Sequence, residues 1–199
     1  FQGAGTVPRR FEASQARAGS LEFWVELMGV YLEETQKLLS ALLYPQPGLR
    51  AAASILAANT RSQPALWAYG ISGDYPILLV RIAAEEGLDI VQEMLQAHTY
   101  WRKRGLKIDL VIMNQRQAGY NQDLRDQLHR LLALTHSEIW INQRGGIFLL
   151  NSSQLLEDDR MVLETAARVV LDTGTAENGG SQTSLVAQLD APRRRSEPL

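Results

Sequence analysis

The sequence predicts an α/β fold: a small, mainly parallel sheet of three to four strands with covering helices, preceded by an N-terminal helical segment. Two short runs, residues 76–82 and 106–113, are almost continuously apolar, which is typical of strands buried on both faces. Apolar residues at helical spacing separate these two runs and also follow the second one. This alternation of strands and helices favours parallel strands joined by right-handed crossovers.

The N-terminal part is predicted to be helical after a linker. Residues 1–19 contain Gly, Pro and Arg with few apolar side chains, which indicates a linker. Over residues 21–43 the apolar positions recur at helical spacing, which predicts an amphipathic helix or helix pair that ends before Pro45. A short Ala-rich helix is expected over residues 49–58.

The remaining elements follow in order along the chain. After the first strand we expect a helix over residues 85–104, and after the second strand a helix over 121–134. Two strand-like runs come next, residues 139–141 and 147–150, with a hairpin-like Gly-Gly connection between them, and a third helix is expected over 154–171. Residues 20–172 therefore form one predicted domain. Residues 173–199, which are rich in Gly, Ser and Thr in their first half, are predicted to be a flexible connector.

Composition and charge exclude several function classes. The formal charge of −2 over 199 residues argues against nucleic acid or an anionic membrane surface as the partner. The absence of cysteine excludes disulfides, thiolate metal sites and cysteine nucleophiles. Arg81 and Asp109 interrupt the two most apolar stretches, so we expect no direct insertion into a membrane. The chain begins with Phe1 and carries no signal peptide pattern, so we expect it to be processed or cut from something longer.

The most distinctive local feature is the segment of residues 66–76, which has two interpretations. Its two aromatic residues could stack on a sugar ring while its Ser and Asp side chains bind hydroxyl groups. Alternatively it is a turn, because two glycines supply a permissive backbone and the Ser and Asp side chains bind local amides. The candidate sugar-binding residues of this segment are Trp67, Tyr69, Ser72 and Asp74.

No catalytic or metal site is predicted within the chain. The glycines of the 66–76 segment precede a strand, whereas a dinucleotide fingerprint follows one, and no phosphate-binding loop occurs. The three histidines lack the spacing of a zinc site. His98 lies on the apolar stripe of its predicted helix, which indicates a core histidine rather than a ligand.

Polar residues at the ends of the predicted strands form a second candidate group. Asp109 lies inside an apolar strand, so we expect it either to face an edge of the sheet or to pair with a cation such as Arg81 on a neighbouring strand. A role as a substrate ligand is the functional alternative. Ligands of open α/β sheets bind outside the carboxyl ends of the strands. That rule selects a polar set suited either to sugar hydroxyls or to capping of the next helices: Arg81, Asn114, Gln115 and Asn151.

Three stretches together resemble one family. They are Gly-Ile-Ser-Gly-Asp-x-Pro-Ile at 70–77, Tyr-Trp-Arg-x-x-Gly-Leu-x-x-Asp-Leu-Val-Ile at 100–112, and Arg-Gly-Gly-Ile-Phe-Leu-Leu at 144–150. In order and spacing, residues 20–175 resemble the cyclic β-1,2-glucan synthases, very large membrane-bound proteins. Two departures occur: Gln115 stands where the family pattern has Glu, and the insert at 173–180 is longer than usual.

The resemblance implies a parent protein and a place within it. Such a parent polymerises β-1,2-linked glucose from UDP-glucose, with a divalent metal, trims the product by phosphorolysis and cyclises it. The resemblance places this chain in the phosphorylase-like region (glycosyltransferase family 36, similar to cellobiose phosphorylase) at the cytoplasmic face of the inner membrane. The family's catalytic residues belong to other modules, so none is carried over to this chain and no cofactor is expected in it.

Two functional hypotheses follow. In the first, the chain is a non-catalytic segment whose partners are the other modules of the same polypeptide, which it positions. In the second, it is a glucan-binding module that uses the 66–76 segment together with Arg81, Asn114 and Gln115 at the strand ends.

Overall fold

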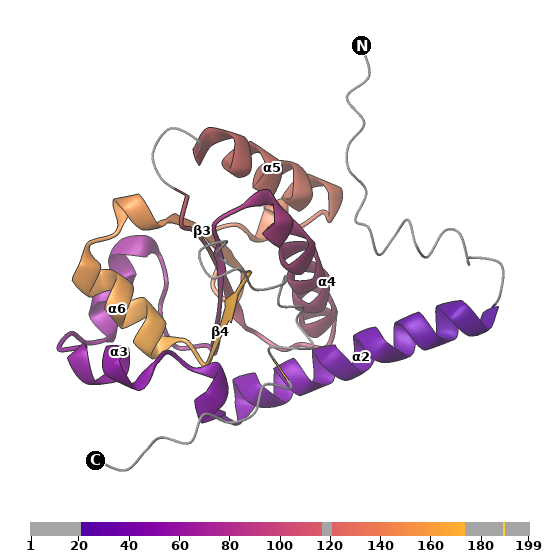
Figure 1. The fold of residues 1–199 in the computed structure, drawn as a ribbon, viewed down its shortest axis with the longest axis horizontal. Helices are drawn as coiled ribbons and strands as arrows, with labels where there is room; N and C mark the ends of the chain where they lie inside the picture. The colour runs from indigo at the N-terminus through magenta and orange to yellow at the C-terminus, as the bar shows by residue number, and fades with distance from the viewer. Residues whose placement is uncertain (1–20, 117–120, 174–188, 190–199) are drawn as a thin grey trace.

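The fold is a four-stranded parallel sheet covered by helices on both faces. We describe it from a computed structural model, which covers residues 21–116, 121–173 and 189 (Figure 1). The strands are β1 (Ile77–Ile82), β2 (Asp109–Asn114), β3 (Ile147–Asn151) and β4 (Val169–Asp172), arranged in the order β3-β2-β1-β4. All three strand pairs are parallel. The predicted linker 1–19 lies outside the described residues, as does the predicted connector apart from Thr173 and Leu189.

The helices divide between the two faces of the sheet. Helices α4 (Leu88–Lys103) and α5 (Asn121–Leu134) cover one face, and α6 (Glu157–Ala166) covers the other (Figure 1). Helix α2 (Leu21–Leu43) lies beside the sheet, with its last turns packed near β4. The short helix α3 (Ala53–Ala58) packs against α6. None of the described helices is long and apolar enough to cross a membrane.

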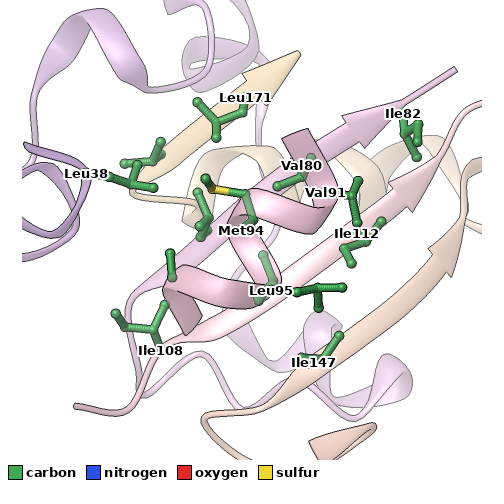
Figure 2. Packing of buried hydrophobic residues seen from close by; sticks show 14 of the residues in the cluster. Leu38, Val80, Ile82, Val91, Met94, Leu95, Ile108, Ile112, Ile147 and Leu171 are labelled. Carbon is green, nitrogen blue, oxygen red and sulfur yellow. The ribbon is translucent and has the colours of Figure 1, made fainter. Parts of the chain in front are cut away.

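Because both faces are covered, the strands bury side chains in two directions. Leu78 and Val80 of β1 belong to a first cluster. Figure 2 shows Val80 in this cluster with Leu95 of α4 and Leu38 of α2. Leu79 lies between Leu78 and Val80 in sequence and points into a second cluster, on the α6 side. Strands buried on both faces need apolar residues at nearly every position, and this explains the unbroken apolar runs. The predicted α/β class and parallel sheet are therefore confirmed.

Two predicted elements are wrong. Residues 139–141 are not a strand: Glu138–Trp140 is a 3-10 helix, and Ile141 makes only an isolated bridge with Ile147. A hairpin is excluded because this bridge is parallel, whereas the two strands of a hairpin are antiparallel. Helix α6 ends at Ala166 rather than at 171, and the residues after it form β4.

The other boundaries shift by a few residues. The helix predicted over 49–58 is a 3-10 turn, Pro47–Leu49, followed by α3. The helix predicted from residue 85 begins as the 3-10 turn Glu85–Gly87, and the α-helix starts at Leu88. Ahead of β1, residues Gln63–Tyr69 form a further 3-10 helix, η2, which the sequence did not predict as an element.

Candidate functional site

The 66–76 segment lies at the amino edge of the sheet, where β1 begins. Helix η2 ends at Gly70, which adopts a left-handed conformation with φ of 76°, and Gly73 follows with φ of 74°. Gln63 donates a side-chain hydrogen bond to the carbonyl oxygen of Ser72 at 2.7 Å, and the indole Nε1 of Trp67 donates to the same oxygen at 3.3 Å. The segment is therefore a closed turn. Trp67 nevertheless remains 63% exposed.

Tyr69 joins this turn to α6. Its hydroxyl donates a hydrogen bond to Oδ2 of Asp159 at 2.8 Å, and Arg61 binds the other carboxylate oxygen at 2.7 Å. Burial, and then the hydrogen bond to the Asp159 carboxylate, raise the pKa of the Tyr69 hydroxyl above its usual value. The polar end of Tyr69 is thus engaged within the fold.

Asp74 links the turn to the loop before β3. Its carboxylate forms an ion pair with Arg144, and its backbone N–H donates to the Ser72 hydroxyl at 3.3 Å. The same Arg144 guanidinium lies 5.6 Å from the centre of the Tyr75 ring. Asp74 also lines a groove of about 300 Å³ beside the C-terminal end of α6; Trp67, Tyr69 and Ser72 do not line it.

The other predicted residues lie at the opposite edge of the sheet. Arg81 is the fifth residue of β1, and Asn114 and Gln115 follow at the end of β2. A six-residue strand is about 20 Å long, so the length of β1 separates the Asp74 turn from this edge. The structure therefore does not bring the candidate residues of the 66–76 segment and those of the strand ends into one site.

Arg81 pairs with acidic residues other than Asp109. Its guanidinium forms ion pairs with Glu164 of α6, at 3.4 Å, and with Asp172 of β4. The expected Arg81–Asp109 pair is wrong because Asp109 lies opposite Ile77 in the strand register, at the amino edge, whereas Arg81 lies opposite Met113. The sequence placed both on adjacent strands but did not determine the register.

Asp109 instead belongs to a buried cluster around Gly145. Its Oδ1 accepts a hydrogen bond from the Gly145 N–H at 2.7 Å. His98 Nε2 binds the Gly145 carbonyl oxygen at 3.2 Å and that of Ile108 at 3.1 Å, and Arg102 binds Gly145 as well. Because both partners of Nε2 are acceptors, Nε2 carries the proton of the neutral imidazole. His98 is buried as a core histidine, as predicted.

Burial shifts the pKa values of His98 and Asp109 in opposite directions. It lowers the pKa of His98 to about 4, against the opposing effect of the Ile108 carbonyl. It raises the pKa of Asp109 to about 6, against the opposing effects of the Gly145 N–H and the nearby Arg144. In the part of the chain that the structure describes, His98 Nδ1 has no hydrogen-bond partner, so a second proton there would be unsatisfied.

The carboxyl edge holds a second cavity, of about 300 Å³, between β2, β3 and α5. Asn114 and Asn151, both selected from the sequence, line it and lie opposite each other in the strand register. Arg125 and His129 of α5 line it too, although neither was selected from the sequence. Their spacing of four residues places both side chains on one helical face, but a solvated helix face shows the same pattern.

Comparison with known proteins identifies one curated relative. The chain is 45% identical over 87 residues to the cyclic beta-(1,2)-glucan synthase NdvB of Rhizobium meliloti (strain 1021). This chain is similar to a segment of a cyclic glucan synthase. The matched residues make up 44% of this chain and 3% of NdvB, and the similarity supports the family that the motifs indicated. No family model matches the chain.

Proposed function

We propose that the chain is a segment of a cyclic β-(1,2)-glucan synthase that positions neighbouring modules of the same polypeptide and does not itself catalyse a reaction. The observation that supports a cyclic glucan synthase as the parent protein is the 45% identity over 87 residues to NdvB. In this proposal the segment belongs to the phosphorylase-like region of a membrane-bound parent. UDP-glucose and a divalent metal would bind to other modules of that parent.

The positioning role is supported by the contacts of the candidate residues, which link separate elements of the fold. Asp74 pairs with Arg144, which precedes β3, and Tyr69 binds Asp159 of α6. Arg81 ties β1 to α6 through Glu164. These polar side chains hold separate elements in fixed relation, as a unit that orients its neighbours requires.

The experiment is an assay of the 199-residue chain for phosphate-dependent cleavage of β-1,2-glucan and for glucosyl transfer from UDP-glucose. We expect neither activity, while the intact synthase, assayed in parallel, shows both. Robust turnover by the chain alone would overturn the non-catalytic role. Sequencing the DNA on both sides of the coding segment tests the parent, and adjoining synthase modules are the expected result.

Glucan binding by the 66–76 segment is the second candidate, favoured by one observation. Trp67 is 63% exposed, although its Nε1 donates to the Ser72 carbonyl oxygen, and an exposed indole can stack on a sugar. Titration with β-1,2-linked oligosaccharides would then quench tryptophan fluorescence, and the quenching would disappear in Trp67→Phe but persist in Trp140→Phe. An unchanged fluorescence spectrum at millimolar oligosaccharide would contradict glucan binding and leave positioning as the proposed role.

A further inference from the structure

The carboxyl-edge cavity lies where the chain changes direction across the sheet. After β2 the chain crosses to α5 on the face of the first cluster, and after β3 it crosses to α6 on the opposite face (Figure 1). The helices that follow these two adjacent strands therefore diverge to opposite faces of the sheet. In open α/β sheets, ligands bind in the crevice that such a divergence creates outside the carboxyl ends of the strands.

The lining of this cavity is rich in hydrogen-bonding groups above an apolar floor. Five apolar residues supply this floor: Ile112, Leu128, Ile141, Leu149 and Leu150. Six polar residues line the rest, and they come from both strands, from α5 and from the loops around β3: Asn114, Arg125, His129, Asn142, Asn151 and Gln154. No Asp or Glu is among the lining residues. Carboxamides and an imidazole match hydroxyl groups, which both donate and accept.

The two asparagines are fixed by their own loops. Asn114 is 4% exposed, and its Oδ1 accepts a hydrogen bond from the Arg116 N–H at 2.9 Å. The Oδ1 of Asn151 accepts from both the N–H and the hydroxyl of Ser153. With this oxygen occupied, the Asn151 side chain offers its amide N–H groups to a ligand. A preorganised donor of this kind favours acceptor-rich ligands.

The charge at the cavity is positive. Arg125 and His129 are exposed on one face of α5, and neither has a hydrogen bond or ion pair among the described residues. A guanidinium carries its charge throughout the ordinary pH range and matches the geometry of a phosphate. Helix α5 begins at Asn121, after β2, so the positive end of its dipole is on this side.

We propose that this cavity binds a small, hydroxyl-rich anion of the hexose phosphate class. Arg125 and His129 bind the phosphate, the carboxamides of Asn151 and Gln154 bind sugar hydroxyls, and the C–H face of the ring lies on the apolar floor. The volume of about 300 Å³ accommodates one sugar ring and its phosphate rather than an oligosaccharide. The site is independent of the proposed parent, since it depends only on the cavity and its lining residues.

The test is an NMR titration of the whole chain with glucose 1-phosphate, glucose 6-phosphate, glucose and inorganic phosphate. At least one hexose phosphate should give saturable shifts of the Asn114, Asn151 and early α5 amides, at lower concentration than either glucose or phosphate. Arg125→Gln and His129→Gln should each weaken binding about tenfold or more. Arg130→Gln is the matched control: it removes a cation from the next exposed position of α5, which does not line the cavity, and should leave binding unchanged.

Three results would overturn the proposal. One is the absence of saturable shifts with every probe up to about 10 mM, well above an ordinary small-molecule affinity. Another is binding of inorganic phosphate as tight as that of the hexose phosphates, which would mean a simple anion site. The third is equal weakening by Arg125→Gln and Arg130→Gln, which would indicate general charge attraction rather than this cavity. The thermal midpoints of all variants confirm that each is folded.

Discussion

His98 and Asp109 bind the two polar groups of one residue: Asp109 accepts the N–H of Gly145, and His98 binds its carbonyl oxygen. Both side chains are at most 1% exposed. Burial lowers the pKa of His98 to about 4 and raises that of Asp109 to about 6. Two groups that meet at one peptide therefore contribute opposite pH dependences to the stability of the fold.

The signs follow from proton linkage. For His98 the unfolded pKa of about 6.5 exceeds the folded one, so the unfolded chain binds more protons and stability falls as the pH drops from 6.5 towards 4. For Asp109 the folded pKa exceeds the unfolded one, so stability rises as the pH drops from 6 towards 4. Each effect is about 3 kcal/mol at 1.36 kcal/mol per pKa unit, so the two nearly cancel.

Single substitutions should separate the two contributions. In Asp109→Asn the free energy of unfolding should fall on acidification relative to the native chain, by up to about 3 kcal/mol between pH 6.5 and pH 4. In His98→Gln, whose amide can still donate to the carbonyls, it should rise by a similar amount. Urea unfolding at several pH values in this window measures both. Parallel pH profiles for the three proteins would contradict the linkage.

Arg81 should be needed for stability rather than for ligand binding. Replacing it by Met leaves Glu164, whose side chain is only 5% exposed, without this ion-pair partner, and a buried charge without its partner costs about 3–5 kcal/mol. Arg160→Met is the control, because its pair with Glu157 is far more exposed and should contribute at most about 1 kcal/mol. Denaturant unfolding compares them.

A second substitution identifies the cause. Adding Glu164→Gln to Arg81→Met removes the buried carboxylate charge that Arg81→Met leaves without this ion-pair partner. The double variant should therefore recover part of the lost stability. If Arg81→Met lowers the free energy of unfolding no more than Arg160→Met does, the β1–α6 ion pair is not a structural link. The positioning role then loses one of its supporting observations.

Tyr69 should contribute to the stability of the fold through its hydroxyl group. Tyr69→Phe removes the hydrogen bond to Asp159, and we expect a loss of about 1–2 kcal/mol, because Arg61 still binds that carboxylate. Tyr44, which is 74% exposed, supplies the control Tyr44→Phe, with an expected change near zero. Spectrophotometric titration gives a second measurement, since the phenol of raised pKa should vanish from the profile of Tyr69→Phe only.

The parts of the fold that the sequence predicted are those with a strong periodic signal. Strands β1 and β2 are buried on both faces, and α5 has a regular apolar stripe, so each was located closely. Strand β4 was missed because Val169–Asp172 continues the apolar spacing of α6, and only pairing with β1 makes it a strand. Local sequence carries no information about that pairing.

The candidate site residues were likewise predictable only where a local sequence pattern marked them. Asn114 and Asn151 were selected together because each ends a strand and parallel strands end at one edge. Arg125 and His129 occupy the polar positions of an amphipathic helix, which in sequence is indistinguishable from any solvated face. Their relation to the cavity depends on where α5 packs on the sheet.

The turn before β1 can be tested through two glycines that share a backbone conformation but differ in surroundings. Gly73 and Gly105 have φ values of 74° and 79°, so an alanine at either position costs about 1–2 kcal/mol of backbone strain. At Gly105 a Cβ atom would meet nothing within 4 Å, whereas at Gly73 it would lie 2.8 Å from Cγ of Gln63. The Gln63 side chain would have to move, breaking its 2.7 Å hydrogen bond to the Ser72 carbonyl oxygen. Gly73→Ala should therefore cost about 1 kcal/mol more than Gly105→Ala in denaturant unfolding, and equal costs would show that Gln63 does not close the turn.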